Sequence, residues 1–163
     1  MNIFNPAVDW IMSMEGGLHD DPNDPGGLTN LGIALERHPE MTAQQIRALT
    51  PVTAAPIYYR EYFVPMRGDQ LPDWAAWVAL DSAVNQGVHE ATLILQRAAH
   101  VVADGVIGPQ TLAAVARQPP KQFLAAFTAG RDIVYSNSRS WRRYGDGWVH
   151  RATLAALEAI THA

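Results

Sequence analysis

The chain has 163 residues, 48% of them hydrophobic and 17% charged, which is typical of a globular domain large enough to bury its own core. The formal net charge of -4 excludes the broad positive potential that drives nucleic-acid binding, so we expect no DNA or RNA partner. The absence of cysteine excludes disulfides, thiolate metal sites and a cysteine nucleophile.

The first predicted element is an amphipathic helix that begins at Asn5 and Pro6 and ends at Glu15, before the glycine pair 16–17. No basic residue precedes its apolar stretch, which contains Asp9, so the segment is unlike a cleavable secretory signal. No later run reaches the roughly 18 apolar residues of a membrane span. We therefore expect no integral membrane segment, and a separate export step if the protein acts outside the cytoplasm.

The segment from His19 to Gly27 contains two Asp-Pro steps and a glycine pair, which predicts a loop. A capping box at Thr42 predicts a short helix through Ala48, and Thr50 opens another toward residue 63. Pro56 should delay the start of that second helix or kink it.

The rest of the chain is predicted to be helical, without a convincing series of strands. Predicted helices cover about residues 72–86, 89–102, 109–117, 121–135 and 146–160, and a basic, serine-rich segment at 136–144 separates the last two. The sequence therefore predicts an all-α fold with little or no β-sheet.

Glu15 stands at a helix end that disfavours a carboxylate, because the carboxyl terminus of a helix carries partial negative charge. This position should raise the pKa of Glu15, and a protonated carboxylic acid is what glycoside hydrolysis needs to protonate the leaving sugar oxygen. By position alone, a glutamate before two glycines is more often an ordinary surface residue.

Asp24 and Thr29 strengthen the catalytic interpretation of Glu15. A tight loop can bring both back toward the acid, where a carboxylate and a hydroxyl can orient a water and stabilise positive charge on the sugar. A distant second carboxylate gives an inverting enzyme and a closer one a retaining enzyme. The sequence leaves the two open.

Two possible metal-binding motifs lack residues that the metal would need as ligands. A calcium loop starting at Asp21 would have Pro25 and Gly32 at ligand positions, and the start of a zinc-protease motif at His89 has Leu93 in place of its second histidine. We expect no metal and no organic cofactor.

The pair Asn85 and Gln86, and the aromatic residue Trp141, each have two possible roles. Asn85 and Gln86, at the end of an apolar helix, either bond the N-acetyl or hydroxyl groups of a glycan or face water. Trp141, within the basic segment, either stacks on sugar faces or belongs to a solvated loop.

The segment 15–33, with Glu15-Gly16-Gly17, DPNDPGGLT and Gly32-Ile33, resembles the signature of glycoside hydrolase family 108, the N-acetylmuramidases of phage endolysins and related secretion muramidases. The resemblance continues through YREYF at 59–63 and DSAVNQG at 81–87. It then extends into a peptidoglycan-binding region through DGVIGPQTL at 104–112 and GWVHR at 147–151. Leu18 departs from the family pattern, which commonly has an aromatic residue there.

This resemblance implies a lysozyme-like helical fold, with a catalytic region at 1–90 and a peptidoglycan-binding region at 91–163 packed as one globule. It implies hydrolysis of the β-1,4 bond between N-acetylmuramic acid and N-acetylglucosamine. The implied site residues are Glu15 as general acid, Asp24 and Thr29 as holders of the water, and Asn85, Gln86 and Tyr59 as substrate contacts.

The expected partner is the glycan strand of peptidoglycan, and we expect a monomer. The expected setting is phage or prophage lysis of a host, with a holin or dedicated export step delivering the protein from the cytoplasm to the periplasm. Muramidase-assisted secretion is the other setting. A lytic transglycosylase, a noncatalytic wall-binding module and a chitin-cleaving enzyme are the alternatives.

Overall fold

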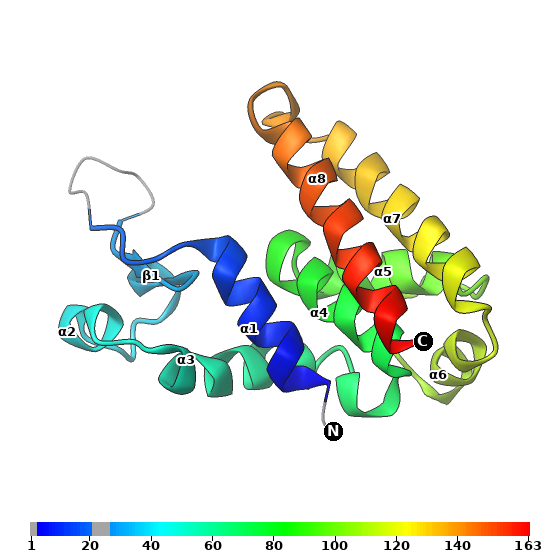
Figure 1. Ribbon diagram of the computed structural model, residues 1–163, viewed down its shortest axis with the longest axis horizontal. Coiled ribbons are helices and arrows are strands. Elements are labelled where there is room, and N and C mark those ends of the chain that lie inside the picture. The colour runs from blue at the N-terminus through cyan, green and yellow to red at the C-terminus, as the bar shows by residue number, and fades with distance from the viewer. Residues whose placement is uncertain (1–2, 21–26) are drawn as a thin grey trace. The chain divides into compact units, whose positions relative to one another are not determined.

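The computed structural model describes residues 3–20 and 27–163, and Figure 1 shows their arrangement. These residues form eight α-helices and one small sheet of two antiparallel strands, so the predicted all-α fold is confirmed. The chain divides into two compact units, Asn5–Glu61 and Tyr62–Ala163 with the residues through Phe4. Within the described ranges, no helix is long and apolar enough to cross a membrane.

The smaller unit contains the first helix and the sheet. Its elements are α1 (Phe4–Glu15), β1 (Thr29–Asn30), β2 (Ile33–Ala34), η1 (Leu35–Arg37), α2 (Ala43–Arg47), α3 (Pro51–Tyr58) and the π-helical segment η2 (Tyr59–Phe63), which runs into the larger unit. In the sheet, Thr29 pairs with Ala34 and Asn30 with Ile33. Strands of two residues are too short to produce the alternating pattern that predicts a strand.

Both helices predicted from threonine start signals form. Gln45 N–H donates to Thr42 Oγ1 over 3.2 Å and Thr42 N–H donates to Gln45 Oε1 over 2.7 Å, which completes the capping box of α2. Thr50 and Thr53 form a second box at the start of α3. Because this box fixes the first turn, Pro56 does not delay the start of α3.

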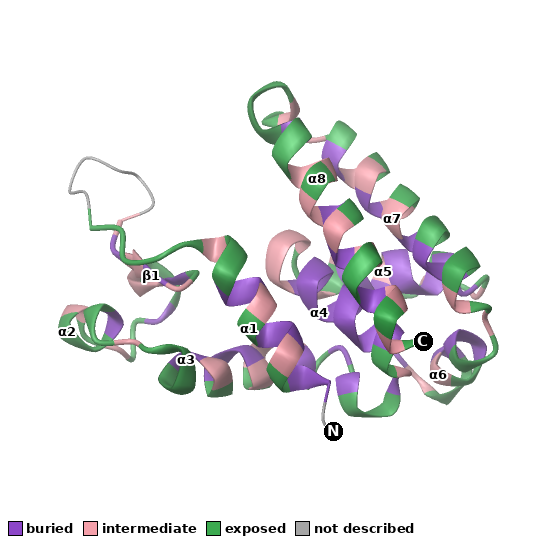
Figure 2. Cartoon of the chain, viewed as in Figure 1, coloured by how far each residue is buried: buried purple, intermediate pink, exposed green. Residues whose placement is uncertain are grey.

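The larger unit is built around one buried helix. Its elements are η3 (Gly68–Gln70), α4 (Asp73–Gln86), α5 (Val88–Ala98), α6 (Pro109–Ala116), α7 (Pro120–Ser136), α8 (Trp141–Ala159) and η4 (Ile160–His162). Helix α4 contacts α5, α7 and α8, and every residue from Trp74 to Ala83 is buried, as the purple ribbon in Figure 2 shows. A helix that is apolar on all sides needs such neighbours to exclude water.

The last helix begins earlier than the sequence predicts. Helix α8 starts at Trp141, whereas the sequence predicts a basic, serine-rich segment at 136–144 and a helix from about Asp146. A Cβ on Gly145 would lie 2.5 Å from the ring of Trp141, one turn earlier in the helix. Gly145 therefore lets the indole lie against the helix, and this packing overrides the low helix propensity of glycine.

The motif at 104–112 has a structural role in the larger unit. The buried side chain of Gln96 donates from Nε2 to Asp104 Oδ1 (2.7 Å) and to the carbonyl oxygen of Val106 (3.0 Å). Gly105 N–H in turn donates to Gln96 Oε1 over 2.9 Å. The hydrogen bond from Gln96 is the main cause that lowers the pKa of Asp104. These bonds fix the turn that precedes α6.

We expect Asp132→Asn to stabilise the protein at neutral pH. Asp132 Oδ1 on α7 is buried and has no hydrogen-bond partner among the described residues, and burial raises the pKa of Asp132 against the effect of Arg131. A raised pKa means that the folded state favours the neutral acid, so the corresponding stability is present at low pH and is lost as the pH rises through the folded-state pKa. Asparagine mimics the neutral acid.

Thermal unfolding at about pH 7 should show a higher Tm for Asp132→Asn than for wild type, and the gain in Tm should disappear near pH 3. An equal gain at both pH values would contradict this explanation.

Candidate active site

Glu15 is the last residue of α1 and is half-buried. Gly16, directly after it, has φ +81°, a conformation that suits glycine and ends the helix. The end of α1 is thus fixed by backbone geometry, which sets where the carboxylate of Glu15 is presented.

A tight hairpin turn packs against the stem of Glu15. The turn joins β1 and β2 through Leu31 (φ 50°) and Gly32 (φ 74°), the two positive angles of a type I′ turn. A Cβ on Gly32 would lie 2.9 Å from Glu15 Cγ and 2.5 Å from the hydroxyl oxygen of Tyr58. That hydroxyl, on a side chain that is 1% exposed, donates to the carbonyl oxygen of Leu31 over 2.8 Å. The carboxylate stem, the turn and α3 therefore meet at Gly32.

We expect Gly32→Ala to destabilise the protein by roughly 2–4 kcal/mol, because it adds both left-handed backbone strain and a collision with Glu15 and Tyr58. Gly27→Ala is the matched control, since Gly27 has a similar φ of 61° and no atom of the described residues lies within 4 Å of its Cβ position. It should cost only about 1–2 kcal/mol. Urea unfolding of both variants measures the difference, and equal losses would show that the close approach at Gly32 is unimportant.

Thr29, the first residue of β1, pairs with His19, which lies shortly after α1. His19 N–H donates to the carbonyl oxygen of Thr29 over 2.8 Å, and Thr29 N–H donates back to that of His19 over 2.9 Å. Arg47 Nε on α2 donates to Asp20 Oδ2 over 2.8 Å. Asp24, the other predicted holder of water, lies outside the described residues.

The hairpin is also tied to α2. The amide of Asn30, which is 6% exposed, donates from Nδ2 to the carbonyl oxygens of Ile46 (3.0 Å), Arg47 (3.3 Å) and Leu49 (3.2 Å). Carbonyls at the end of a helix have no partner within it, so a buried amide there satisfies them. This arrangement holds β1, and with it Thr29, in a fixed position within the smaller unit.

Tyr59 is the first residue of the π-helical segment η2 and is half-buried in the same unit as Glu15 and Thr29. Short π-helical segments are rare in proteins as a whole, but those that occur are often found at functional sites. Asn85 and Gln86 belong instead to the larger unit, in the last turn of α4.

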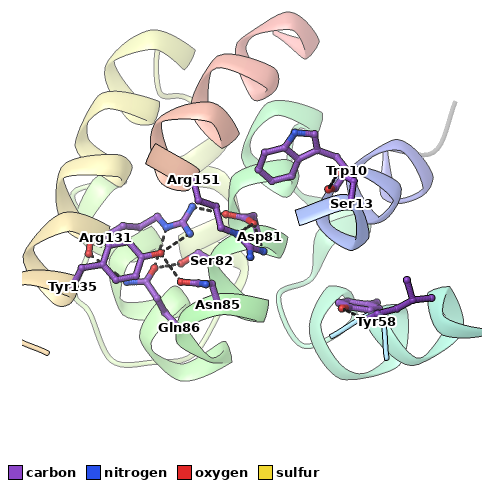
Figure 3. Close-up of polar contacts among 11 residues, drawn as sticks. Trp10, Ser13, Tyr58, Asp81, Ser82, Asn85, Gln86, Arg131, Tyr135 and Arg151 are labelled. Atoms are coloured by element: carbon purple, nitrogen blue, oxygen red, sulfur yellow. Dashed lines mark hydrogen bonds and ion pairs between the residues drawn. The ribbon is translucent and has the colours of Figure 1, made fainter. Parts of the chain in front are cut away.

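A buried charge network surrounds Asn85 and Gln86, as Figure 3 shows. Arg131 on α7 donates from Nη1 to Asp81 Oδ2 over 2.7 Å, and Arg151 on α8 donates from Nε to Asp81 Oδ1 over 2.8 Å. Asp81 is 0% and Arg131 1% exposed, so both charges depend on each other for solvation.

Arg131 also determines the surroundings of both amides. Its Nε donates to Gln86 Oε1 over 3.0 Å and its Nη2 to the hydroxyl oxygen of Tyr135 over 2.8 Å. The Tyr135 hydroxyl then donates to Asn85 Oδ1 over 2.6 Å. The two predicted substrate residues therefore have side-chain oxygens that already accept hydrogen bonds within the protein.

The sequence interpretation did not single out Tyr58, Asp81 or Arg131 as structural partners. One signal was present: Asp81 is a lone carboxylate inside an apolar helix, and a buried acid requires a cation. Nothing local indicates that the cation is Arg131, 50 residues away. Across the described ranges, no group of three or more His, Asp or Glu side chains has a metal-binding arrangement.

Comparison with known proteins agrees with this architecture. Residues 8–87 match the family model described as glycosyl hydrolase 108, and residues 90–153 match the model described as a predicted peptidoglycan domain. Among solved structures, that of Brucella abortus SagA is 32% identical, with a TM-score of 0.86, over 98% of this chain and 94% of that chain. Curated protein sequences give no significant match.

The two family models lie end to end and together span most of the chain, and the similarity to SagA covers nearly all of it. The helical, lysozyme-like fold expected from the sequence agrees with this similarity. The chain therefore belongs to the glycosyl hydrolase 108 family and is a glycoside hydrolase of the muramidase type whose substrate is peptidoglycan.

Proposed function

We propose that the protein hydrolyses the β-1,4 bond between N-acetylmuramic acid and N-acetylglucosamine, with Glu15 as the general acid. The observation that carries this proposal is the placement of Glu15 at the fixed end of α1, half-buried against the turn at Gly32, inside the region that matches glycosyl hydrolase 108. A carboxylic acid held in a fixed position beside the glycosidic bond can deliver a proton to the leaving sugar oxygen.

In the proposed mechanism, Glu15 protonates the glycosidic oxygen as the bond breaks and positive charge develops on the departing sugar ring. Thr29 and Asp24 hold the water that attacks this ring. The backbone bonds between His19 and Thr29 support this role, because they fix one end of the loop beside the hairpin that contacts Glu15. The separation of the two carboxylates decides between inversion and retention.

Tyr59, Asn85 and Gln86 are the proposed substrate contacts. We further propose that residues 1–90 act as the catalytic region and residues 91–163 as the peptidoglycan-binding region. The match of residues 90–153 to a peptidoglycan domain supports the second part of this division.

For the biological setting, we propose lysis of a host by a phage or prophage. The protein would act as a monomer on the cell wall in the periplasm, reached from the cytoplasm through a holin or a dedicated export step.

Binding of the wall by the second half of the chain is a second activity to separate from cleavage, because residues 90–153 match a peptidoglycan domain. Incubation of the whole protein with purified sacculi separates the two. The enzyme should release soluble fragments from sacculi and leave chitin oligomers intact. Cosedimentation without any release would show wall binding without cleavage, and cleavage of chitin would overturn the assigned substrate.

A further inference from the structure

We propose that Asn85 Nδ2 is a hydrogen-bond donor for the acetamide carbonyl oxygen of a bound sugar, and that Arg131, acting through Tyr135, sets its orientation. This inference rests on the proposed function, since it assumes that a glycan of peptidoglycan is the ligand. It assigns Tyr135 and Arg131 as positioning residues.

The direction of the hydrogen bonds follows from the donors available. A guanidinium group has only donors, so the Tyr135 oxygen must accept from Arg131 Nη2 over 2.8 Å. The single hydroxyl hydrogen of Tyr135 is then free to point to Asn85, 2.6 Å away, where it needs an acceptor. Only the amide oxygen can accept, and this places Nδ2 on the opposite side of the amide.

Buried contacts hold the donors and acceptors of this network in the same directions. Arg131 is held on Asp81 at 2.7 Å, and Tyr135 is 4% exposed, with its ring stacked on Trp148 at a centroid distance of 5.2 Å. Burial raises the pKa of Tyr135, so its hydroxyl stays protonated and remains a donor. Without this network, the amide of Asn85 could rotate by about 180° and present either Oδ1 or Nδ2 to a ligand.

Nδ2 of Asn85 donates no hydrogen bond to the described residues. Asn85 is half-buried, and within the described part of the chain the only hydrogen bond of its side chain is the one that its oxygen accepts from Tyr135. The neighbouring amide differs, because Gln86 Nε2 donates inward to the carbonyl oxygen of Arg131 over 3.3 Å. Asn85 is therefore the member of the pair that offers its nitrogen to a ligand.

The ligand must supply an acceptor oxygen. Two N–H groups beside a cluster with two arginines and one aspartate favour a carbonyl oxygen over a hydroxyl donor or an ammonium group. In peptidoglycan, such oxygens belong to the acetamide groups of the sugars and to the peptide stems. We assign the acceptor oxygen to the acetamide group of the sugar. Glycan substrates with and without peptide stems distinguish this oxygen from a carbonyl oxygen of the peptide.

The test uses two substitutions and their combination. Asn85→Asp keeps the acceptor for Tyr135 but replaces the outward donor with an acceptor, so KM should rise about tenfold with kcat changed less than about twofold. Tyr135→Phe keeps the ring on Trp148 but removes the hydroxyl, so KM should rise by a smaller factor. Tyr135→Phe should add nothing to KM in the Asn85→Asp background, because its effect passes through the amide.

Tyr144→Phe is the matched control, since Tyr144 also packs on Trp148 but is 47% exposed, and it should leave KM unchanged. Additive effects of the two substitutions, or a fall in Tm without a change in KM, would show that Tyr135 is only structural. The KM effect of Asn85→Asp should persist on glycan strands stripped of peptides. Loss of that effect would overturn the assignment to the sugar. The proposed function is tested separately, because it predicts that kcat falls by about 10²–10⁴-fold in Glu15→Gln whatever the result at Asn85 and Tyr135.

Discussion

Replacing Glu15 with glutamine should lower kcat for peptidoglycan cleavage by about 10²–10⁴-fold, the usual contribution of a general acid. Glutamine has the same shape but cannot give up a proton, so the leaving sugar would depart as an unprotonated alkoxide. The Cβ and Cγ atoms of Glu15 lie beside Gly32, and glutamine has the same two atoms, so its side chain should fit the same place. KM and the Tm should therefore change little.

The control for Glu15→Gln is Glu36→Gln, which removes an exposed carboxylate of η1 in the same unit and should leave kcat unchanged. The rate of solubilisation of labelled sacculi measures both variants. Glu15→Gln should still cosediment with sacculi, because binding does not need the proton. If Glu15→Gln retained full activity, Glu15 would not be the acid.

Replacing Asp81 with asparagine should destabilise the protein by about 3–5 kcal/mol, the cost of leaving a buried charge without its partner. Two arginines bond this one carboxylate, Arg131 over 2.7 Å and Arg151 over 2.8 Å, and Asp81 is fully buried. The loss should appear in denaturant unfolding as a lower midpoint with an unchanged slope, since the surface exposed on unfolding stays the same.

Glu90→Gln is the matched control for Asp81→Asn. It breaks the surface ion pair between Glu90 and Arg97, whose atoms are 3.5 Å apart on side chains that are 32% and 58% exposed. Exposed pairs contribute at most about 1 kcal/mol. If both substitutions had similarly small effects, the network around Arg131 would not hold the larger unit together.

The parts of the fold that depend on local signals were predictable. The capping box at Thr42 and the helix start at Thr50 both form, because each needs only residues three positions apart. The stop at Gly87 is likewise local. The late start predicted for α8 was wrong, because the packing of Trp141 over Gly145 outweighs the preference of the residues themselves.

The candidate site was predictable only in part. Glu15 and Thr29 were identified from their spacing and from the family resemblance, but the contact between Glu15 and Gly32 depends on a turn whose strands are too short to detect. The bonds of Tyr58 to Leu31 and of Arg131 to Asp81 join residues 27 and 50 positions apart. No pattern within a short segment of sequence predicts contacts between residues so far apart. The hydrogen bonds around Asn85 depend on the contact between Arg131 and Asp81, so they could not be predicted either.

Mass spectrometry of the products from purified sacculi tests the central claim most directly, with wild type and Glu15→Gln analysed side by side. Wild type should yield muropeptides that end in reducing N-acetylmuramic acid, because water completes the reaction, and Glu15→Gln should yield almost none. Products ending in 1,6-anhydro-N-acetylmuramic acid, or in reducing N-acetylglucosamine, would contradict the proposed reaction. Equal product from both proteins would contradict the role of Glu15.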